Sequence, residues 1–122
     1  MDKPTIEQIL PLTPMQKGML VLAYEASGSN RDDPYVIQSW GFLGRIDTNE
    51  VSSAQVLKSL ETALQIVTDR HQALRSIFVT EGQSEPRQVI LGNVKASFQF
   101  HDWSREVDPS RKFKNLLNAD RE

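Results

Sequence analysis

The residues best suited to chemistry lie at a predicted helix-to-strand junction, where Arg70, His71 and Arg75 precede Phe78. A guanidinium presents several donors in one plane and binds carboxylates through paired hydrogen bonds. A His at the end of a long helix is more often a solvated or capping residue, because a cation there suits the helix dipole. The two arginines are therefore expected to reach a carboxylate on a neighbouring element. The pattern does not identify this carboxylate. The candidates in the chain are Asp69, Glu81 and Asp102, and none is favoured over the others.

A second cluster is the adjacent pair His101 and Asp102. Successive strand residues point to opposite faces, so this pair cannot form a catalytic triad alone. His71 and His101 could meet as a metal pair, but no third ligand is suggested. We therefore expect no metal site and no catalytic residue in this chain.

Composition narrows the class of protein. The 122 residues are enough for one domain, and 14 Lys and Arg against 16 Asp and Glu give a net charge of −2. This balance argues against nucleic acid and against an anionic membrane surface, since both require a basic face. There is no Cys, which excludes disulfides and thiolate chemistry. No apolar run could span a bilayer, and the start lacks the apolar core of a secretory signal, so we expect a cytoplasmic domain.

The elements that position these residues begin with a helix over residues 14–25. Thr13 is its predicted N-cap, Pro14 suits the first helical position, and Gln16 can reach back to the Thr13 backbone. Residues 35–46 are rich in β-branched and aromatic side chains and predict a strand, bent near its glycines.

A long second helix follows, with its cap predicted among residues 47–50. Its apolar stripe has helical spacing and, if continued, reaches His71 and Leu74. The stripe consists of Leu57, Leu60, Leu64 and Val67.

The rest of the chain predicts a hairpin, a strand and a last helix. Residues 74–80 and 86–91 form the hairpin around a turn at 81–84, and a second turn follows at 92–93. Residues 94–101 alternate apolar and polar side chains, which predicts a half-buried strand. Asp108 and Pro109 begin the last helix, whose apolar stripe is Phe113, Leu116 and Leu117.

This order predicts a mixed α/β (α+β) fold with a mostly antiparallel sheet packed with helices. The last helical pattern runs into Glu122 with no stop signal, which we interpret as truncation; a frayed terminal helix explains the pattern equally well.

Two segments resemble the motifs of condensation domains from nonribosomal peptide synthetases. Residues 9–20 resemble the opening motif of these domains, at positions Pro14, Met15, Gln16 and Gly18. Residues 70–78 resemble their second motif, Arg-His-x-x-Leu-Arg-x-x-Phe, at positions Arg70, His71, Leu74, Arg75 and Phe78. Residues 102–104, Asp-Trp-Ser, resemble a short Asp-Leu/Trp-Ser segment that commonly follows the second motif in this family. The order and separation of the motifs agree with the family, and the resemblance covers nearly the whole chain.

The resemblance implies that residues 1–122 form the N-terminal part of a two-lobed domain, each lobe like chloramphenicol acetyltransferase. The chain stops before the family's catalytic signature, His-His-x-x-x-Asp-Gly, and contains no His-His pair. At least one motif arginine is implied to be structural and to pair with the aspartate of that signature. His71 falls on a motif position with no established chemical role.

The implied parent activity is amide formation between two carrier-bound thioesters. The substrates are attached to phosphopantetheine arms, so no cofactor is expected to bind directly. The implied partners are carrier domains and the remainder of the synthetase. If the chain is truncated, the surface that the rest of the domain would cover could support self-association. This piece alone is expected to be inactive.

Three alternatives remain at this stage. The parent could be a related epimerising, heterocyclising or ester-forming domain. The chain could be a short non-enzymatic module that binds a carrier or partner protein. It could also be a fragment with no function of its own, with apolar surface left exposed.

Overall fold

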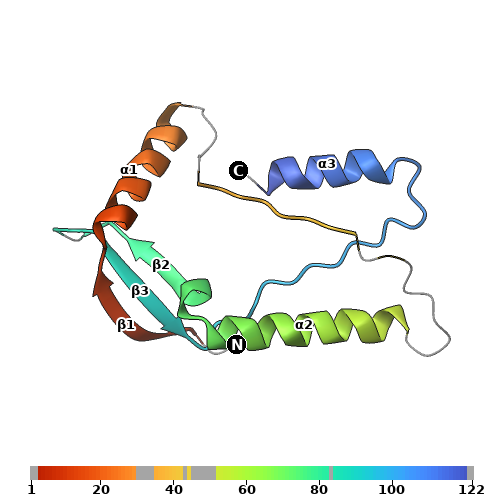
Figure 1. The fold of residues 1–122 in the computed structure, drawn as a ribbon, viewed down its shortest axis with the longest axis horizontal. Coiled ribbons are helices and arrows are strands. Elements are labelled where there is room, and N and C mark those ends of the chain that lie inside the picture. Colours follow the sequence, from red (N-terminus) through yellow and green to blue (C-terminus); the bar gives the residue numbers. More distant parts are fainter. Residues whose placement is uncertain (1–2, 30–34, 43, 45–51, 83, 121–122) are drawn as a thin grey trace. The chain divides into compact units, whose positions relative to one another are not determined.

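The computed structural model describes residues 3–29, 35–42, 44, 52–82 and 84–120. In these ranges the elements follow in the order strand, helix, helix, 3-10 turn, two strands and helix (Figure 1). Their bounds are β1 Thr5–Pro11, α1 Pro14–Ser29, α2 Ser53–Arg70, η1 Gln72–Arg75, β2 Ser76–Val79, β3 Arg87–Gly92 and α3 Pro109–Ala119.

The chain divides into two compact units. The first comprises Met1–Leu20 and Leu43–Phe98, and the second comprises Val21–Phe42 and Gln99–Glu122. The first unit contains the sheet, α2 and both motifs. Helix α1 crosses the division, and α3 belongs to the second unit.

The sheet of the first unit is antiparallel with strand order β1-β3-β2 (Figure 1). Strands β2 and β3 form the predicted hairpin, with Gly82 at φ 69° in the turn between them. Ile9, Val89 and Ile77 lie opposite one another across the three strands, and cross-strand partners share a face of the sheet. Val89 is buried, whereas Ile9 and Ile77 on the two edge strands are exposed.

Helix α1 begins as predicted. The Thr13 hydroxyl accepts from the Gln16 N–H at 3.3 Å, and the Gln16 side chain accepts from the Thr13 N–H at 2.9 Å, which together form a capping box. The helix continues to Ser29, four residues beyond the predicted end at residue 25. Gly28 lies inside this extension, and neither it nor Ser27 terminates the helix.

Helix α2 forms where its apolar stripe predicts, but its cap lies later than expected. Ser52 is the N-cap and shares a capping box with Gln55. The predicted cap region at 47–50 lies outside the described residues. Leu60 and Val67 of the stripe are exposed.

The strand predicted at residues 74–80 is wrong at its start. Helix α2 ends at Arg70, and residues 72–75 form the 3-10 turn η1, so β2 begins only at Ser76. The helical stripe therefore does not continue to His71 and Leu74. The His71 backbone closes α2 by donating to the Val67 carbonyl and opens η1 by accepting from the Leu74 N–H.

The strand predicted at 94–101 does not form. Residues 94–103 adopt neither helix nor strand. The Gln65 amide on α2 donates to the Val94 carbonyl at 3.0 Å and accepts from the Ala96 N–H at 2.9 Å. A helix side chain thus satisfies backbone groups that a sheet partner would otherwise use.

In the second unit, α3 begins as predicted, because the Asp108 side chain accepts from the Arg111 N–H and Pro109 occupies the first turn. The strand predicted at 35–46 is wrong where it can be compared: residues 36–42 form neither helix nor strand, and residues 43, 45 and 46 lie outside the described residues. A strand exists only with a hydrogen-bonded partner, and no ladder forms here among the described residues.

The fold class is mixed α/β with an antiparallel sheet, as predicted. The buried apolar side chains in the described ranges are Leu12, Ala26, Val89 and Ile90. In the same ranges every helix is too short or too polar to traverse a lipid bilayer.

Candidate functional site

The centre of the candidate site is the Arg75 side chain, which is 9% exposed and lies in the first unit. Its Nε donates to the Thr68 carbonyl at 3.1 Å, and its Nη2 lies 3.4 Å from the Asp69 carbonyl. These carbonyls belong to the last turn of α2, where the helix provides no N–H partner for them. Arg75 therefore caps the C-terminal end of α2 with its own side chain.

The remaining nitrogen of the guanidinium faces the sheet. Arg75 Nη1 donates to the Glu7 carboxylate at 2.5 Å and to the Leu91 carbonyl. The same side chain thus connects the end of α2 with β1 and β3. Such charge-assisted bonds are stronger than neutral ones, and burial increases the cost of losing one partner.

Glu7 reaches Arg75 because β1 is irregular at that residue. Ile6 lies opposite Leu91 and Gln8 lies opposite Ile90, so Glu7 is the extra residue of a β-bulge. A bulge bends the strand and redirects a side chain. Here it aligns the carboxylate with Arg75 Nη1, which also bonds to the residue opposite the bulge.

The Glu7 carboxylate is held mainly in its charged form. Its hydrogen bond from Arg75, followed by one from the Gln72 amide at 3.2 Å, lowers the pKa of this carboxyl below its ordinary value. Both donors belong to the second motif region and act on the same carboxylate, one on each oxygen.

The partner of Arg75 corrects the sequence interpretation. Asp69, Glu81 and Asp102 were the acidic candidates, and none of their carboxylates pairs with it; Asp69 contributes only its backbone carbonyl. The partner is Glu7, so this guanidinium does not lack a carboxylate in the chain. Arg70, in the last turn of α2, is exposed and makes no side-chain bond to any described residue.

The other residues of the second motif lie on the surface. His71 is exposed and contributes its backbone to the junction between α2 and η1. Leu74 is 54% exposed and Phe78 is 46% exposed. Of the five motif positions, the structure buries Arg75 alone.

A hydrogen-bond network links the opening motif to the second motif. Gln16 Nε2 donates to Gln88 Oε1 at 3.1 Å, and Gln88 Nε2 donates to the Ser76 hydroxyl at 2.9 Å. Ser76 then donates to the Gln72 carbonyl, and Gln72 donates to Glu7. We call Gln16, Gln88, Ser76, Gln72, Glu7 and Arg75 the motif-linking network.

The remaining opening-motif residues take no part in this network. Pro14 starts α1, and Met15 is 77% exposed. Gly18 is exposed on α1, and a Cβ at this position would meet no atom within 4 Å. Among the described residues, no neighbour packs closely enough to require a glycine at this position.

In the second cluster, His101 and Asp102 each make a local contact. The His101 ring stacks on Trp103, with ring centroids 5.6 Å apart. Asp102 accepts from the Ser104 N–H at 2.9 Å, and bonds from Ser104 lower the pKa of the Asp102 carboxyl. In the described part of the chain, no three His, Asp or Glu side chains lie close enough to hold a metal ion.

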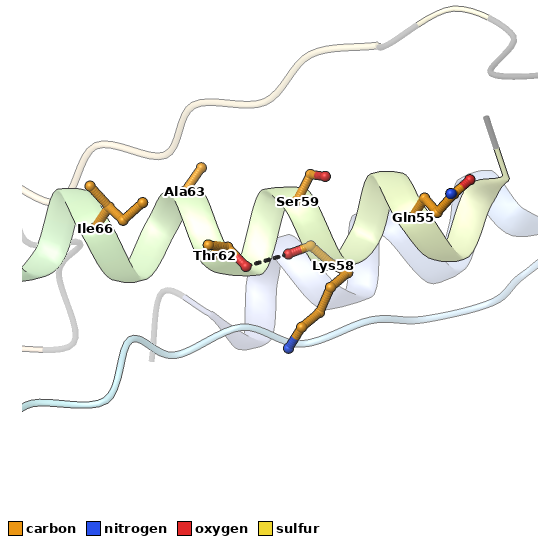
Figure 2. Close-up of a pocket in the computed structure, with 6 residues that line it drawn as sticks. All are labelled: Gln55, Lys58, Ser59, Thr62, Ala63 and Ile66. Carbon is orange, nitrogen blue, oxygen red and sulfur yellow. Dashed lines mark hydrogen bonds between the residues drawn. The ribbon is translucent and has the colours of Figure 1, made fainter. Parts of the chain in front are cut away.

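A hollow of about 530 Å³ lies along one side of α2 (Figure 2). Its described lining residues all belong to this helix: Gln55, Lys58, Ser59, Thr62, Ala63 and Ile66. The Thr62 hydroxyl bonds back to the Lys58 carbonyl, so it is already satisfied within the helix (Figure 2). The described lining thus comes from one helix face, whereas concave ligand sites normally bury most of their ligand.

Two of the residues that organise the site, Glu7 and Gln88, were missed by the sequence analysis. The signal for Glu7 was present, since Glu7 and Gln8 are consecutive polar residues between Ile6 and Ile9 and break the strand alternation. Gln88 lies in a predicted strand, and nothing in its neighbourhood indicated that it connects two motifs.

The family model described as "Condensation domain" matches residues 6–122, which include both motifs.

The chain belongs to the condensation-domain family.

Relatives of this condensation-domain chain are large synthases. It is 36% identical over 121 residues to a linear gramicidin synthase protein of Brevibacillus parabrevis, which covers 96% of this chain and 1% of that protein. It is 30% identical over 122 residues to bacitracin synthase 3 of Bacillus licheniformis, covering 98% of this chain and 2% of that protein. Nonribosomal peptide synthetase 5 of Gibberella zeae is 34% identical over 76 residues, which is 62% of this chain and 1% of that protein.

The chain therefore spans only 1–2% of the length of these relatives. No solved structure gives a significant match. The mixed α/β fold with its small antiparallel sheet is consistent with part of a condensation-domain lobe.

Proposed function

We propose that residues 1–122 form the N-terminal part of a condensation domain, whose parent synthetase joins two carrier-bound acyl groups through an amide bond. One observation carries the proposal: the condensation-domain family model matches residues 6–122, which include both motifs. The name of one relative, nonribosomal peptide synthetase 5, agrees with it.

The proposed reaction is acyl transfer between two phosphopantetheine arms on carrier domains. The amine of the acceptor attacks the thioester carbonyl of the donor, so that a C–N bond forms and the C–S bond breaks. The donor arm leaves as a thiol, and the amine loses its proton to a base. Positioning of the two arms and removal of that proton are the steps that a protein can accelerate.

The role we assign to this chain within that domain is structural. All three guanidinium nitrogens of Arg75 are engaged by the Glu7 carboxylate and by three backbone carbonyls. A guanidinium held in this way fixes α2 against β1 and β3 and has little capacity to take part in proton transfer. The signature His-His-x-x-x-Asp-Gly does not occur in the 122 residues. We therefore expect the isolated chain to form no amide.

The test is a chimera. In the linear gramicidin synthase relative from Brevibacillus parabrevis, the segment that matches this chain is replaced by residues 1–122. Amide formation between loaded carriers is then followed by mass spectrometry of the acceptor arm. The chimera is expected to transfer the donor acyl group, and the isolated chain under the same conditions is expected to give no product.

Two matched controls make the result specific. A chimera with Arg75→Ala is expected to lose both activity and thermal stability, because the carbonyls of the α2 end and of β3 lose their donor. A chimera with Arg70→Ala is expected to keep its thermal stability, since this side chain bonds to no described residue. A loss of activity in this variant would therefore not reflect unfolding. A folded wild-type chimera without amide product would refute the proposed function, and product from the isolated chain would refute the purely structural role.

A further inference from the structure

Gln88 lies on β3, the strand between β1 and β2 (Figure 1). It is half-buried and lies opposite Leu10 on β1 and Phe78 on β2. Ser76 lies opposite Ile90, two residues further along β3, so Ser76 and Gln88 are diagonal neighbours on one face of the sheet. A long side chain spans such a diagonal, and Gln88 is therefore placed to connect β2 with the first turn of α1, which follows β1.

The direction of the hydrogen bonds around Gln88 is fixed by a backbone group. The Thr13 N–H can only donate, so it bonds to Gln16 Oε1 at 2.9 Å and leaves Gln16 Nε2 to face Gln88. Gln88 accepts this bond with Oε1 and presents Nε2 to the Ser76 hydroxyl at 2.9 Å. That hydroxyl has a single proton, which it donates to the Gln72 carbonyl at 2.9 Å. Each of these side chains therefore accepts on one side and donates on the other, in sequence from α1 to η1.

The motif-linking network ends at the Glu7 carboxylate, which the Gln72 side chain contacts. Gln72 Nε2 donates to one carboxylate oxygen at 3.2 Å, and Arg75 donates to the other. Gln72 is exposed, so water competes for its amide, and its side chain loses rotamer freedom in this geometry. The bond from Ser76 restrains the Gln72 backbone and so restricts the positions that the amide can take. The contact between Gln72 and Glu7 thus depends on how firmly that hydroxyl is held.

We propose that Gln88 is a positioning residue, which holds the Gln72 side chain on the Glu7 carboxylate although it bonds to neither. While the Gln88 amide donates to Ser76, that hydroxyl must direct its own proton to the Gln72 carbonyl. Without the amide the hydroxyl is free to rotate, and the second motif loses its side-chain link to the start of α1. The opening and second motifs are in this way coupled through a residue that lies in neither. The proposal does not depend on the condensation function proposed above.

NMR titration of the Glu7 carboxyl measures this effect at a distance. Gln88→Met keeps the length of the side chain and removes both amide hydrogen bonds. The hydrogen bonds from Arg75, and after it from Gln72, lower the pKa of Glu7. We expect Gln88→Met to raise this pKa toward its ordinary value, while Arg75 still keeps it lowered. At neutral pH, the Gln72 side-chain amide protons are expected to exchange with water faster in Gln88→Met than in wild type.

Gln8→Met is the matched control. It makes the same substitution on the neighbouring strand β1, directly beside Glu7 in the sequence, at a side chain that bonds to no described residue. The Glu7 pKa and the exchange rate of the Gln72 amide are expected to keep their wild-type values in this variant. A change that appears in Gln88→Met and not in Gln8→Met therefore reflects the motif-linking network, and not the loss of a polar group near Glu7.

A second background tests whether Gln88 acts through Gln72. Gln72→Met removes the amide that contacts Glu7, and it is expected to raise the Glu7 pKa directly. If Gln88 acts only through this amide, adding Gln88→Met to the Gln72→Met variant changes the pKa no further. An independent effect of Gln88 on Glu7 would instead add to the effect of Gln72→Met.

The proposal is overturned if Gln88→Met leaves the Glu7 pKa or the Gln72 exchange rate unchanged, or if Gln8→Met changes them equally. A further rise of the pKa when Gln88→Met is added to Gln72→Met also overturns it. Backbone amide spectra show whether each variant is folded. Should Gln88→Met unfold, Ser76→Ala breaks the network at its next residue and is expected to give the same two changes. Unchanged values in Ser76→Ala overturn the proposal in that case.

Discussion

Arg75 combines two roles that are usually separate, a helix cap and an ion-pair partner. Its Nε and Nη2 satisfy the end of α2, while Nη1 binds Glu7 and the β3 backbone. Arg70, five positions earlier in the same motif, is exposed on the last turn of α2. Two arginines of one motif are therefore expected to differ sharply in their contribution to stability.

Replacement of each arginine by alanine tests this difference. Arg75→Ala removes a buried guanidinium and leaves three backbone carbonyls without their donor, and we expect a loss of about 3 kcal/mol in the free energy of unfolding. Arg70→Ala is expected to change it by less than about 0.5 kcal/mol. Urea unfolding followed by circular dichroism measures both values. Equal losses for the two variants would contradict the assignment of Arg75 as the structural arginine.

The Glu7–Arg75 pair also predicts a dependence of stability on pH. The hydrogen bond from Arg75 lowers the pKa of Glu7 in the folded chain below its ordinary value of 4.5. A carboxyl of this kind stabilises the fold fully above its unfolded pKa, and this contribution is lost as the pH falls through the folded pKa. Wild type is therefore expected to exceed Glu7→Gln in thermal midpoint at neutral pH, and the difference is expected to shrink in acid below about pH 4.5.

The comparison between wild type and Glu7→Gln isolates this carboxyl. Asp102 also has a lowered pKa, but it is present in both proteins and cancels in the difference. A difference in midpoint that stays constant from neutral pH to pH 3 would show that the Glu7 charge contributes nothing.

Long-range geometry explains why Glu7 was missed when Arg75 was recognised. The motif spacing marked Arg75 as a placed guanidinium, but its partner lies 68 residues away in the sequence. Only the β-bulge at Glu7 and the pairing of β1 with β3 bring the two side chains together. Local patterns indicate which side chains need a partner, whereas topology decides which partner they obtain.

At the level of elements, β1 and β3 leave little room between Thr5 and Gly92, which lie opposite each other. A Cβ at Gly92 would lie 2.8 Å from Thr5 Oγ1, closer than real contacts allow. The absence of a side chain at Gly92 thus lets the end of β3 pair with the start of β1. Gly92 has no positive φ, so the restriction comes from space alone.

A double-mutant cycle tests this contact. Gly92→Ala is expected to lower the free energy of unfolding by about 1–3 kcal/mol through overpacking against the Thr5 hydroxyl. Thr5→Ala removes that hydroxyl, so Gly92→Ala is expected to be much less destabilising in the Thr5→Ala background. The prediction fails if Gly92→Ala has the same effect in both backgrounds, as urea unfolding will measure.

Sequence reasoning succeeded for elements with local signals. The cap of α1 at Thr13, the start of α3 at Asp108 and the hairpin of β2 and β3 each depend on residues within a few positions of one another. The strand expected at 94–101, and the described part of the one expected at 35–46, did not form, because alternation and β-branched content show only the capacity to pair. In 94–96 the backbone bonds to the Gln65 side chain instead, a contact that no periodicity reveals.

At the level of the whole molecule, the two motifs gave the family, and the family model matches nearly the whole chain. The motifs did not predict how they are joined. Gln16 and Ser76 meet through Gln88, which lies in neither motif, and the network then continues to Glu7 and Arg75. The sheet thus contributes to the site as a connector between motifs as well as a support for them.

The pairing of β1 with β3 must wait until β3 has been synthesised. Strand β1 is made first, yet its partner residues, 87–92, emerge roughly 80 residues later. At about 5–20 residues per second, the ribosome leaves β1 unpaired for roughly 4–16 s. Throughout that interval Ile6 and Ile9 have no sheet to join, so β1 waits for its partner strand longer than β2, which β3 follows directly.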